Sequence, residues 1–271
     1  MTPAAAAAAG SGSGSPERLR IRAGNPGPYT LDGTNTWVVG RDPAYVIDPG
    51  PALPEHIEAI VGALADRGGL GAILLTHDHP DHAEGVEPLR ARLPAPVAAA
   101  RGAVDVRLAD GDRLGPLRVI ATPGHAPDHL AFLAGRACFT GDAVLGTGSV
   151  FVAPLPGAMA AYLEGLRRLR ALDPGVLCPG HGPPVAEAGA KLDEYLAHRA
   201  ARERRLVAGL DDGLRSVDDL LARVWAEVPP PLRLAAAVTL EAHLDKLDGD
   251  GRLPPGVERR RYDGPAGGAA P

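Results

Sequence analysis

Cysteine and aromatic residues are scarce in this sequence. The 271 residues include two cysteines, Cys138 and Cys178, and each lies within a short apolar run. Cysteines in such positions are predicted to be buried free thiols and not a disulfide, which fits a reducing compartment. Cys178 precedes His181 by three residues and is interpreted as a small core residue, with the border of a site as the alternative. Aromatic residues make up only 4% of the chain, so alanine, leucine and valine must fill the core.

Long apolar runs and an excess of basic residues are also missing. No stretch approaches the ~18 apolar residues of a membrane span, so we predict a cytoplasmic protein with no membrane partner. The net charge of −5 argues against a basic surface for nucleic acid over the whole protein. Residues 1–16 lack the basic start of a signal peptide and are predicted, like residues 264–271, to be a disordered tail.

Residues 76–82, Thr-His-Asp-His-Pro-Asp-His, carry three histidines and two aspartates. The apolar run 71–75 before them is typical of a buried strand, and residues 83–93 after them open like a helix. His77 and His79 are two apart and point to one side of an extended backbone, while Asp81 and His82 lie where the chain turns. Imidazole and carboxylate are ligands of zinc and its first-row neighbours. A polar loop that happens to be rich in histidine is the alternative.

Three further candidate ligands each follow a strand-like run downstream. They are His125 after residues 117–121, Asp142 after residues 137–140 and His181 after residues 176–178. Each has a glycine beside it, which lets the backbone turn sharply and approach a metal closely. Seven candidate ligands at strand ends are a specific signal for a metal site: His77, His79, Asp81, His82, His125, Asp142 and His181.

The ligand order His-x-His-x-Asp-His, His, Asp, His resembles that of the metallo-beta-lactamase superfamily. The resemblance implies an α/β (α+β) fold, a four-layer αββα sandwich of two mainly antiparallel sheets with the metals at one edge. It also implies two Zn²⁺ per chain, with Mn²⁺ or Fe²⁺ possible, and a metal-activated hydroxide that attacks carbon or phosphorus. Asp81 and Asp142 are the expected catalytic residues. By the family pattern, one ion is held by His77, His79 and His125, the other by Asp81, His82 and His181, and Asp142 bridges them.

A closer resemblance, to the beta-lactamase-like protein 2 group, rests on residues 25–36, 145–149 and 195–203 and runs from about residue 20 to about residue 261. It implies a phosphodiesterase, an endoribonuclease that acts on single-stranded RNA. The alternative is an acyl hydrolase of a thioester, ester or lactone, similar to hydroxyacylglutathione hydrolases and polyketide-type thioesterases, with a small-molecule substrate. A binding protein with a dead site is a third hypothesis, which the intact ligand set opposes.

Periodicity and turn residues predict the order of the elements in the first two thirds of the chain. Helices are expected at residues 54–67 and 158–172. Besides the strand before the metal motif, strands are expected at residues 19–22, 36–39, 44–47, 97–100, 118–121, 129–133, 137–140 and 176–178.

The last third is predicted to be a winged-helix-like module, as the closer family also carries. A long helix at residues 186–210 is followed by a helix capped by Ser216, a helix at residues 234–247 and a small hairpin within residues 252–262. We therefore divide the chain into a catalytic domain, 17–190, and a C-terminal domain, 191–263. We expect the long helix to line the substrate groove through one face, with a solvated face as the alternative; that face carries Lys191, His198, Arg202 and Arg205.

Several residues outside the ligand set are expected to orient a ligand or to contact substrate. They are Asp78, His129, Asn35, Thr147, Arg199 and Arg202. A buried, hydrogen-bonded core histidine is an equal interpretation of His129, and His56 and His243 are interpreted as structural or exposed.

Overall fold

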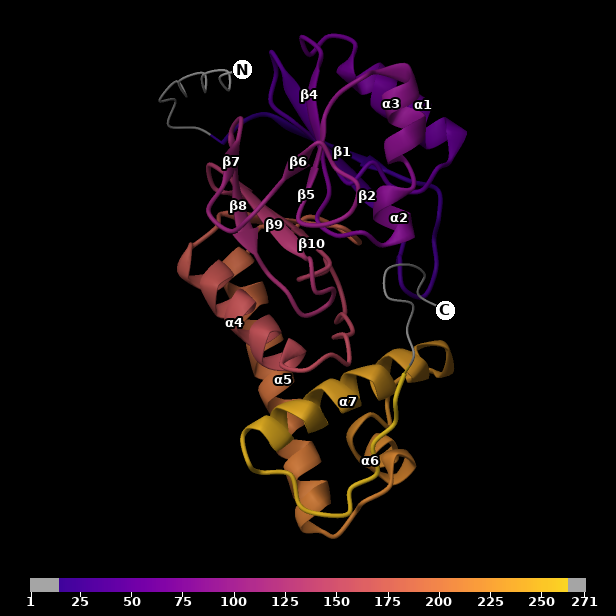
Figure 1. Cartoon of the computed structure of the whole chain (residues 1–271), viewed down its shortest axis with the longest axis vertical. Helices are drawn as coiled ribbons and strands as arrows, with labels where there is room; N and C mark the ends of the chain where they lie inside the picture. Colours follow the sequence, from indigo (N-terminus) through magenta and orange to yellow (C-terminus); the bar gives the residue numbers. More distant parts are fainter. Residues whose placement is uncertain (1–14, 263–271) are drawn as a thin grey trace.

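The computed structural model describes residues 15–262, which form two connected parts (Figure 1). The larger part holds two β-sheets with helices on their outer faces, and the smaller part is a group of helices beside it. The predicted tails at 1–16 and 264–271 lie outside the described residues except for Ser15 and Pro16. Ser15 Oγ accepts a hydrogen bond of 2.9 Å from the backbone N–H of Arg136.

The first sheet is built from six strands in chain order. The first two pairings are antiparallel and the next three are parallel. The prediction of mainly antiparallel strands is therefore wrong for this sheet. Helices connect β3 to β4 and β4 to β5, and such crossovers return the chain in the same direction. The strands are β1 (Arg18–Arg22), β2 (Asn35–Val39), β3 (Ala44–Ile47), β4 (Leu70–Leu74), β5 (Val97–Ala99) and β6 (Val106–Arg107).

The second sheet has five strands in the order β11-β10-β9-β8-β7. Its pairs are antiparallel except for β10 and β11, because α4 (Ala158–Ala171) connects them. The parallel pairing places the ends of β10 and β11 at the same edge of the sheet. The strands are β7 (Arg113–Leu114), β8 (Leu117–Ala121), β9 (Leu130–Ala134), β10 (Ala137–Gly141) and β11 (Val176–Pro179).

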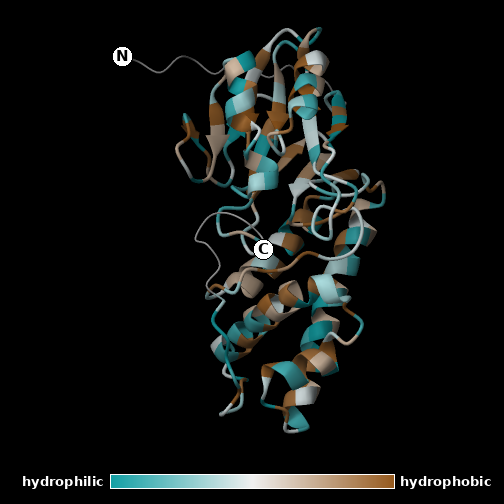
Figure 2. Ribbon diagram, turned by 90° about the vertical axis from the view of Figure 1, so that its right-hand side faces the viewer, coloured by the Kyte–Doolittle hydropathy of each residue, from teal (hydrophilic) through white to brown (hydrophobic). Residues whose placement is uncertain are grey.

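The two sheets pack face to face, and helices cover both outer faces, as predicted for the αββα sandwich. Between the sheets, Trp37 meets Phe139 edge-on, with ring centroids 5.7 Å apart. On one outer face lie α1 (Pro54–Leu64) and α3 (Val86–Arg92), and on the other lie α4 and α5 (Ala188–Asp211). In Figure 2 the strands are largely brown while the outer helices mix brown with teal, which is the pattern of half-buried helices.

Cys138 and Cys178 are both buried and free, so the prediction of free thiols is confirmed. Burial raises the pKa of each thiol to about 12. At Cys138, the neighbouring Cys178 adds to this rise in pKa. Thiols of such high pKa carry almost no thiolate at neutral pH and are therefore poor metal ligands.

The C-terminal part is held together by its own apolar cluster. The second half of α5 packs there with α6 (Val217–Val224) and α7 (Arg233–Gly249), and the short 3₁₀ helix η1 (Pro230–Leu232) contacts α7. Ser216 accepts a hydrogen bond from the backbone N–H of Asp219, so the predicted serine cap is confirmed. The predicted domain division at residues 190 and 191 falls inside α5, which packs on α4 and on α6.

The predicted hairpin at residues 252–262 is wrong, because these residues contain no strand. Pro254 and Pro255 cannot donate to a strand ladder. The segment is held instead by individual contacts, including the Glu258 N–H to the Arg215 carbonyl at 2.8 Å and the ion pair of Arg260 with Asp218 at 2.9 Å. Within residues 15–262, no helix has the length and apolar character to cross a membrane.

Candidate metal centre

The seven candidate ligands come together because each follows a strand that ends at the same edge of the sandwich. Beyond β4, the chain places His77 and His79 in a loop and Asp81 and His82 on the short helix α2 (Pro80–Ala83). His125 follows β8, and Asp142 and His181 follow the parallel pair β10 and β11. Strand ends are rigid supports, so the loops that leave them can hold side chains in a fixed geometry.

His77, His79 and His125 form the first group of potential ligands. The Nε2 atom of His77 lies 3.0 Å from Nδ1 of His79, and that Nδ1 lies 3.1 Å from Nε2 of His125. Two ligands about 2.05 Å from one tetrahedral ion are about 3.3 Å apart. The three ring nitrogens are thus spaced like ligands of a single metal ion.

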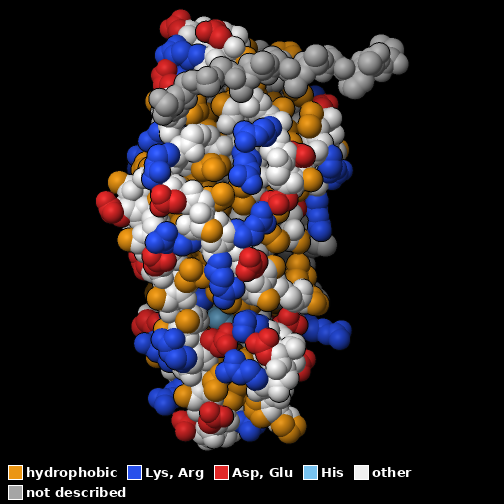
Figure 3. Space-filling model, turned by 90° about the vertical axis from the view of Figure 1, so that its left-hand side faces the viewer, with side chains coloured by type: hydrophobic (Ala, Val, Ile, Leu, Met, Phe, Trp, Pro, Cys, Tyr) orange, Lys and Arg blue, Asp and Glu red, His pale blue; other side chains and the backbone are white. Residues whose placement is uncertain are grey.

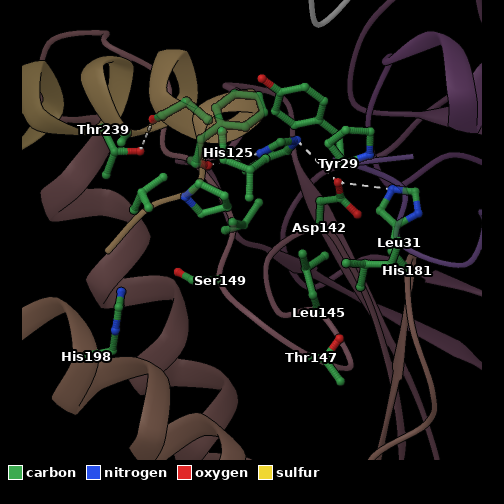
Figure 4. A pocket seen from close by; sticks show the side chains of 18 of the residues that line it. Tyr29, Leu31, His125, Asp142, Leu145, Thr147, Ser149, His181, His198 and Thr239 are labelled. Carbon is green, nitrogen blue, oxygen red and sulfur yellow. Dashed lines mark hydrogen bonds and ion pairs between the residues drawn. The ribbon is translucent and has the colours of Figure 1, made fainter. Parts of the chain in front are cut away.

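Asp81, His82 and His181 form the second group, and Asp142 lies between the two groups. His181 Nε2 is 3.1 Å from Asp81 Oδ2 and 3.3 Å from His82 Nε2. Asp142 Oδ2 is 3.6 Å from His125 and 3.5 Å from His181, which belong to different groups (Figure 4). A carboxylate in this position can contact two cations at once.

In four of these histidines, the ring nitrogen Nδ1 points away from the other ligands and is hydrogen-bonded to a protein oxygen. Thr76 Oγ1 accepts from His77 Nδ1, and Asp48 Oδ2 accepts from His82 Nδ1. The carbonyls of Phe151 and Gly33 accept from Nδ1 of His125 and His181. Each bond leaves a lone pair on the inward Nε2 atom. Converging lone pairs repel one another unless a cation or a proton lies between them, so the donor set fits a pair of divalent metal ions.

Asp142 Oδ1 gives a second indication that a cation belongs here. This carboxylate oxygen is buried and makes no hydrogen bond within residues 15–262. Burial alone would raise the pKa of Asp142, but His181 and His82 outweigh it and hold the pKa well below the usual range. A buried, ionised carboxylate oxygen without a donor is a strong potential metal ligand.

The histidine pKa values divide the site into two halves. Burial lowers the pKa of His77 well below its usual value and lowers that of His125 to about 4. Burial also opposes protonation of His82 and His181, but carboxylates, chiefly Asp81 and Asp142, raise their pKa values to about 9 and about 10. Protons and metal ions compete for the same nitrogens, so metal binding in the second half releases protons.

Asp48 supports the site and was not predicted from the sequence. It is buried at the end of β3 and has a left-handed φ of 51°. Its carboxylate accepts from His82 Nδ1 at 2.9 Å and from both the N–H and the hydroxyl of Thr76 at 2.7 Å. The only sequence signal was its place at a strand end in Asp48-Pro49-Gly50, which reads equally as a turn.

His129 and Asn35, two of the residues expected to orient ligands, lie behind the ligand set. His129 Nε2 accepts from the backbone N–H of Asp142 at 3.0 Å, and its Nδ1 pairs with Thr122 at 2.8 Å. The amide of Asn35 donates to the carbonyls of Pro179 and Gly182, which flank His181. Both residues therefore hold the backbone that carries a ligand.

Two glycines, Gly180 and Gly141, allow the ligand side chains and Thr76 to pack closely against the backbone. A Cβ atom on Gly180 would lie 2.7 Å from both Asp142 Oδ1 and a ring carbon of His82. Gly141 has a φ of 47°, and a Cβ there would lie 2.6 Å from Thr76 Oγ1. Any side chain at Gly180 would therefore displace metal ligands.

The other predicted contact residues lie farther from the ligands. Asp78 is exposed, and in the described part of the chain it makes no hydrogen bond to a ligand. Thr147 is exposed at the rim of a cavity next to the ligands, and Arg199 and Arg202 are buried in its wall. Of the helix face predicted to line a groove, His198 and Arg202 reach this cavity, whereas Arg205 is exposed and Lys191 pairs with Glu194.

The cavity begins at Asp142 and His181 and extends between the two parts of the molecule (Figure 4). It has a volume of about 250 Å³. The sandwich contributes loop residues such as Tyr29 and Phe151, and the C-terminal part contributes α7 and the end of α6. The apolar lining includes Leu31, Leu145, Val150, Phe151, Trp225, Val228, Leu232, Ala235 and Ala236.

The loop that carries Phe151 joins both parts at the cavity. The Phe151 ring lies 4.5 Å from the His125 ring, and its carbonyl accepts from that histidine. The next residue, Val152, donates its N–H to the Thr239 hydroxyl of α7 at 3.3 Å. Tyr29 reaches across the cavity mouth, with its hydroxyl 3.4 Å from the Pro231 carbonyl. Neither Phe151 nor Tyr29 was singled out in the sequence.

Comparisons with known proteins agree with this geometry. The sequence profile of the metallo-beta-lactamase superfamily matches residues 29–112 and 104–181. The profile of the beta-lactamase associated winged helix domain matches residues 216–253. Together the two matches cover β2 to β11 of the sandwich and α6 to α7 of the C-terminal part.

Individual relatives cover most of the chain. It is 32% identical over 252 residues to a beta-lactamase-like protein 2 homolog of Caenorhabditis elegans, covering 86% of this chain and 84% of that protein. It is 33% identical over 258 residues to the atrochrysone carboxyl ACP thioesterase of Aspergillus chevalieri, covering 87% and 82%. The crystal structure of a metallo-beta-lactamase family protein from Thermus thermophilus is similar with a TM-score of 0.70 and 26% identity, covering 86% and 94%.

Proposed function

This chain belongs to the metallo-beta-lactamase superfamily as a metal-dependent hydrolase with a His/Asp metal-binding site, and we propose that its substrate is an acyl thioester. The observation that carries the proposal is the apolar cavity of about 250 Å³ that starts at Asp142 and His181. An acyl chain is apolar and narrow, so it gains free energy by leaving water for such a cavity.

The cavity wall suits an acyl chain better than a nucleic-acid strand. Phe151, Trp225 and Leu232 supply apolar surface, while single-stranded RNA requires a basic groove with stacking platforms. Figure 3 shows one face of the molecule, where Lys and Arg side chains are interspersed with Asp and Glu. The net charge of −5 gives no general attraction for a polyanion.

The residues of the chain have defined tasks in this reaction. His77, His79 and His125 would hold one metal ion, Asp81, His82 and His181 the other, and Asp142 would contact both. We propose Zn²⁺ as the metal, with Mn²⁺ or Fe²⁺ as alternatives. When bound, such a pair of ions activates water and stabilises the charge that develops on oxygen.

Hydrolysis of the thioester requires only water as co-reactant. The oxygen of water joins the acyl carbon, the carbon–sulfur bond breaks, and the products are a carboxylic acid and a free thiol. The cavity holds the acyl chain so that its carbonyl lies beside Asp142 and His181, and such positioning supplies part of the rate. The name of the Aspergillus chevalieri relative, a thioesterase, supports this substrate class.

Phosphodiester hydrolysis is the second candidate, and the similarity to beta-lactamase-like protein 2 homologs favours it through the sequence resemblance described above. Its substrate would be single-stranded RNA. The two arginines expected to line an RNA groove, Arg199 and Arg202, are 2% and 7% exposed and already donate to backbone carbonyls. Buried in a cavity wall, they cannot follow the successive phosphates of an extended strand, which needs an exposed basic groove.

A substrate panel on zinc-loaded protein tests the proposal. We expect hydrolysis of acyl thioesters of pantetheine to exceed that of esters, lactones and single-stranded RNA. The Asp142→Ala variant should lose this activity while it keeps the wild-type circular dichroism spectrum, because the carboxylate shared by both ligand groups is gone. Cleavage of RNA that is lost in Asp142→Ala, with no thioester hydrolysis in wild type, would establish the phosphodiester alternative.

A cavity-filling variant tests where the acyl chain binds. Leu232→Trp enlarges a side chain that lines the cavity and is no metal ligand, so long acyl chains should be excluded while acetyl thioesters are still hydrolysed. The expected result is a change of chain-length preference of about tenfold or more in kcat/KM. Leu234→Trp is the matched control, since Leu234 is exposed nearby on α7 and does not line the cavity.

A further inference from the structure

Arg199 is a buried cation without a counter-ion. Its side chain is only 2% exposed, and its guanidinium lies 5.2 Å from the centre of the Tyr162 ring. It donates to the Ser149 hydroxyl at 3.0 Å and to the Val150 carbonyl, but no carboxylate within residues 15–262 forms an ion pair with it. A buried charge normally has a charged partner, because its loss of hydration is costly.

The groups packed around Arg199 do not supply a negative charge. Burial raises the pKa values of Tyr162 and Tyr195, so both phenols stay neutral. Burial, reinforced by the nearby Arg199, lowers the pKa of His198 to about 4 and that of His243 to about 3, so both imidazoles are neutral at pH 7. The missing negative charge must therefore come from outside this group of side chains.

Arg202 lies one helical turn farther along α5 and lines the same cavity. Its guanidinium stacks on the Trp225 ring at 5.3 Å and donates to the Val224 carbonyl. It pairs with Glu227, a residue that is largely exposed to water. The Nε–H groups of both arginines are buried and have no hydrogen-bond acceptor in the described part of the chain. Two buried guanidiniums with unused donors in the wall of one cavity are suited to bind an oxyanion.

Both arginines line the same cavity as Asp142 and His181, the metal ligands at which it begins. His198, which lies on the same helix and also lines the cavity, is far from Asp142 and His181 in Figure 4. We call the wall formed by His198, Arg199 and Arg202 the arginine end. Apolar side chains line the same cavity, with Phe151 beside the ligand His125 and Trp225 beside Arg202.

We propose that the arginine end is a subsite for an oxyanion carried by the substrate, a proposal that rests on the proposed thioester hydrolysis. The substrate then has its scissile carbonyl at Asp142 and His181, an apolar section along the cavity, and an anionic group at Arg199 and Arg202. The oxyanion has two possible sources, a carboxylate on the acyl chain or a phosphate on the carrier arm. Both offer the planar or branched oxygens that a guanidinium binds through two donors.

Matched substrates distinguish the two sources. N-acetylcysteamine thioesters of monocarboxylic acids with four to ten carbons are compared with those of dicarboxylic acids of equal length, which differ by one carboxylate. Hexanoyl thioesters of pantetheine and phosphopantetheine differ by one phosphate. We expect one of these anions to raise kcat/KM by about tenfold, the size of one charge-assisted contact, mainly through KM.

Variants of the two arginines show whether they cause the preference for the anionic substrate. Arg202→Gln and Arg199→Gln should each reduce the preference for the anionic substrate to below about twofold, while Arg202→Lys keeps part of it. Arg205→Gln is the matched control on the same helix, because Arg205 is exposed. Circular dichroism and the melting temperature show whether each variant folds. Equal kcat/KM for charged and neutral substrates in wild type, or an unchanged preference in both glutamine variants, would overturn the subsite.

A binding measurement separates this subsite from the proposed reaction. Protein stripped of metal with a chelator is titrated by calorimetry with inorganic phosphate and with octanoate. Wild type and Arg205→Gln should bind one of them, and Arg199→Gln and Arg202→Gln should bind it at least about tenfold more weakly. If no thioester is hydrolysed but this pattern appears, the substrate assignment fails and the oxyanion subsite stands. If none of the proteins binds either anion, the subsite is wrong.

Discussion

Asp48 binds no metal in the expected ligand set, yet it fixes the orientation of His82. Its two oxygens accept three hydrogen bonds, two from Thr76 and one from His82. In Asp48→Asn, one oxygen becomes an NH₂ group that faces another donor. We expect affinity at the second metal position to fall by about 10–100-fold, as for other residues that orient metal-binding histidines.

Competition with a coloured chelator measures this effect. One of the two sites should weaken in Asp48→Asn while the other keeps its affinity. Asp66→Asn is the control, because Asp66 is exposed and its carboxylate makes no hydrogen bond among the described residues. Equal weakening of both sites would show that Asp48 supports the whole centre and not His82 in particular.

His243, a buried residue of α7, makes the free energy of unfolding depend on pH. It is fully buried, neither ring nitrogen has a hydrogen-bond partner within the described residues, and its pKa is lowered to about 3. Since the folded pKa lies below the unfolded value of 6.5, the unfolded chain binds the proton more readily. The contribution of neutral His243 to the free energy of unfolding is therefore fully present above about pH 6.5. It is lost progressively as the pH decreases from about 6.5 towards about 3.

Replacement by leucine should remove this dependence. The free energy of unfolding of wild type, minus that of His243→Leu, should fall by about 1.4 kcal/mol for each pH unit below about 6.5. Urea unfolding of metal-free protein at about pH 7.5, 6.0 and 5.0 measures it. A constant difference over this range would mean that His243 binds its proton equally well in the folded and the unfolded chain, so that folding does not lower its pKa.

Helix α7 is tied to the sandwich through the loop that carries Phe151. Thr239→Val keeps the shape of the side chain but leaves the buried Val152 N–H without an acceptor. We expect a loss of about 1–3 kcal/mol in the free energy of unfolding. Because the same loop accepts from His125, KM for the best substrate should also rise.

Thr239→Ser is the matched control for this contact, since it keeps the hydroxyl. Chemical denaturation and steady-state kinetics of both variants give the two quantities. An unchanged free energy of unfolding in Thr239→Val would show that this hydrogen bond does not stabilise the fold.

The elements were predicted well where local sequence determines them. His77, His79, Asp81 and His82 belong to one short motif, and Ser216 caps the helix that directly follows it. Strand direction depends on the partner strand, so periodicity did not reveal the parallel pairs of the first sheet. Turn residues predict a hairpin at residues 252–262, but Pro254 and Pro255 lack the N–H groups that a strand ladder needs.

Residues whose role depends on distant contacts were harder to predict. Asp48 meets His82 only because β3 pairs with β4, and nothing in its own segment shows this. Arg199 was identified as a candidate, but its burial follows from Tyr162 and the loop at Val150, which lie about 40–50 positions earlier. The cavity itself combines residues from positions 28 to 239, so no single segment predicts it.

Metal loading should stabilise the whole molecule and not only the centre. A cation that binds the folded chain at about 1,000 times its Kd adds about 4 kcal/mol to the free energy of unfolding. For a chain of this size, that corresponds to a rise of about 8–16 °C in Tm. Calorimetry of chelator-treated and zinc-loaded protein tests this, and an unchanged Tm would argue against tight binding to the folded state.

The wall contributed by α7 has a consequence during synthesis on the ribosome. The ligand set is complete once His181 has emerged, whereas the cavity also needs Thr239, nearly 60 residues later. At about 5–20 residues per second, translation takes about 3–12 s to cover that distance. A nascent chain therefore carries all seven candidate ligands for some seconds before the residues that enclose the cavity have been made, so the metal site and the cavity are completed at different times.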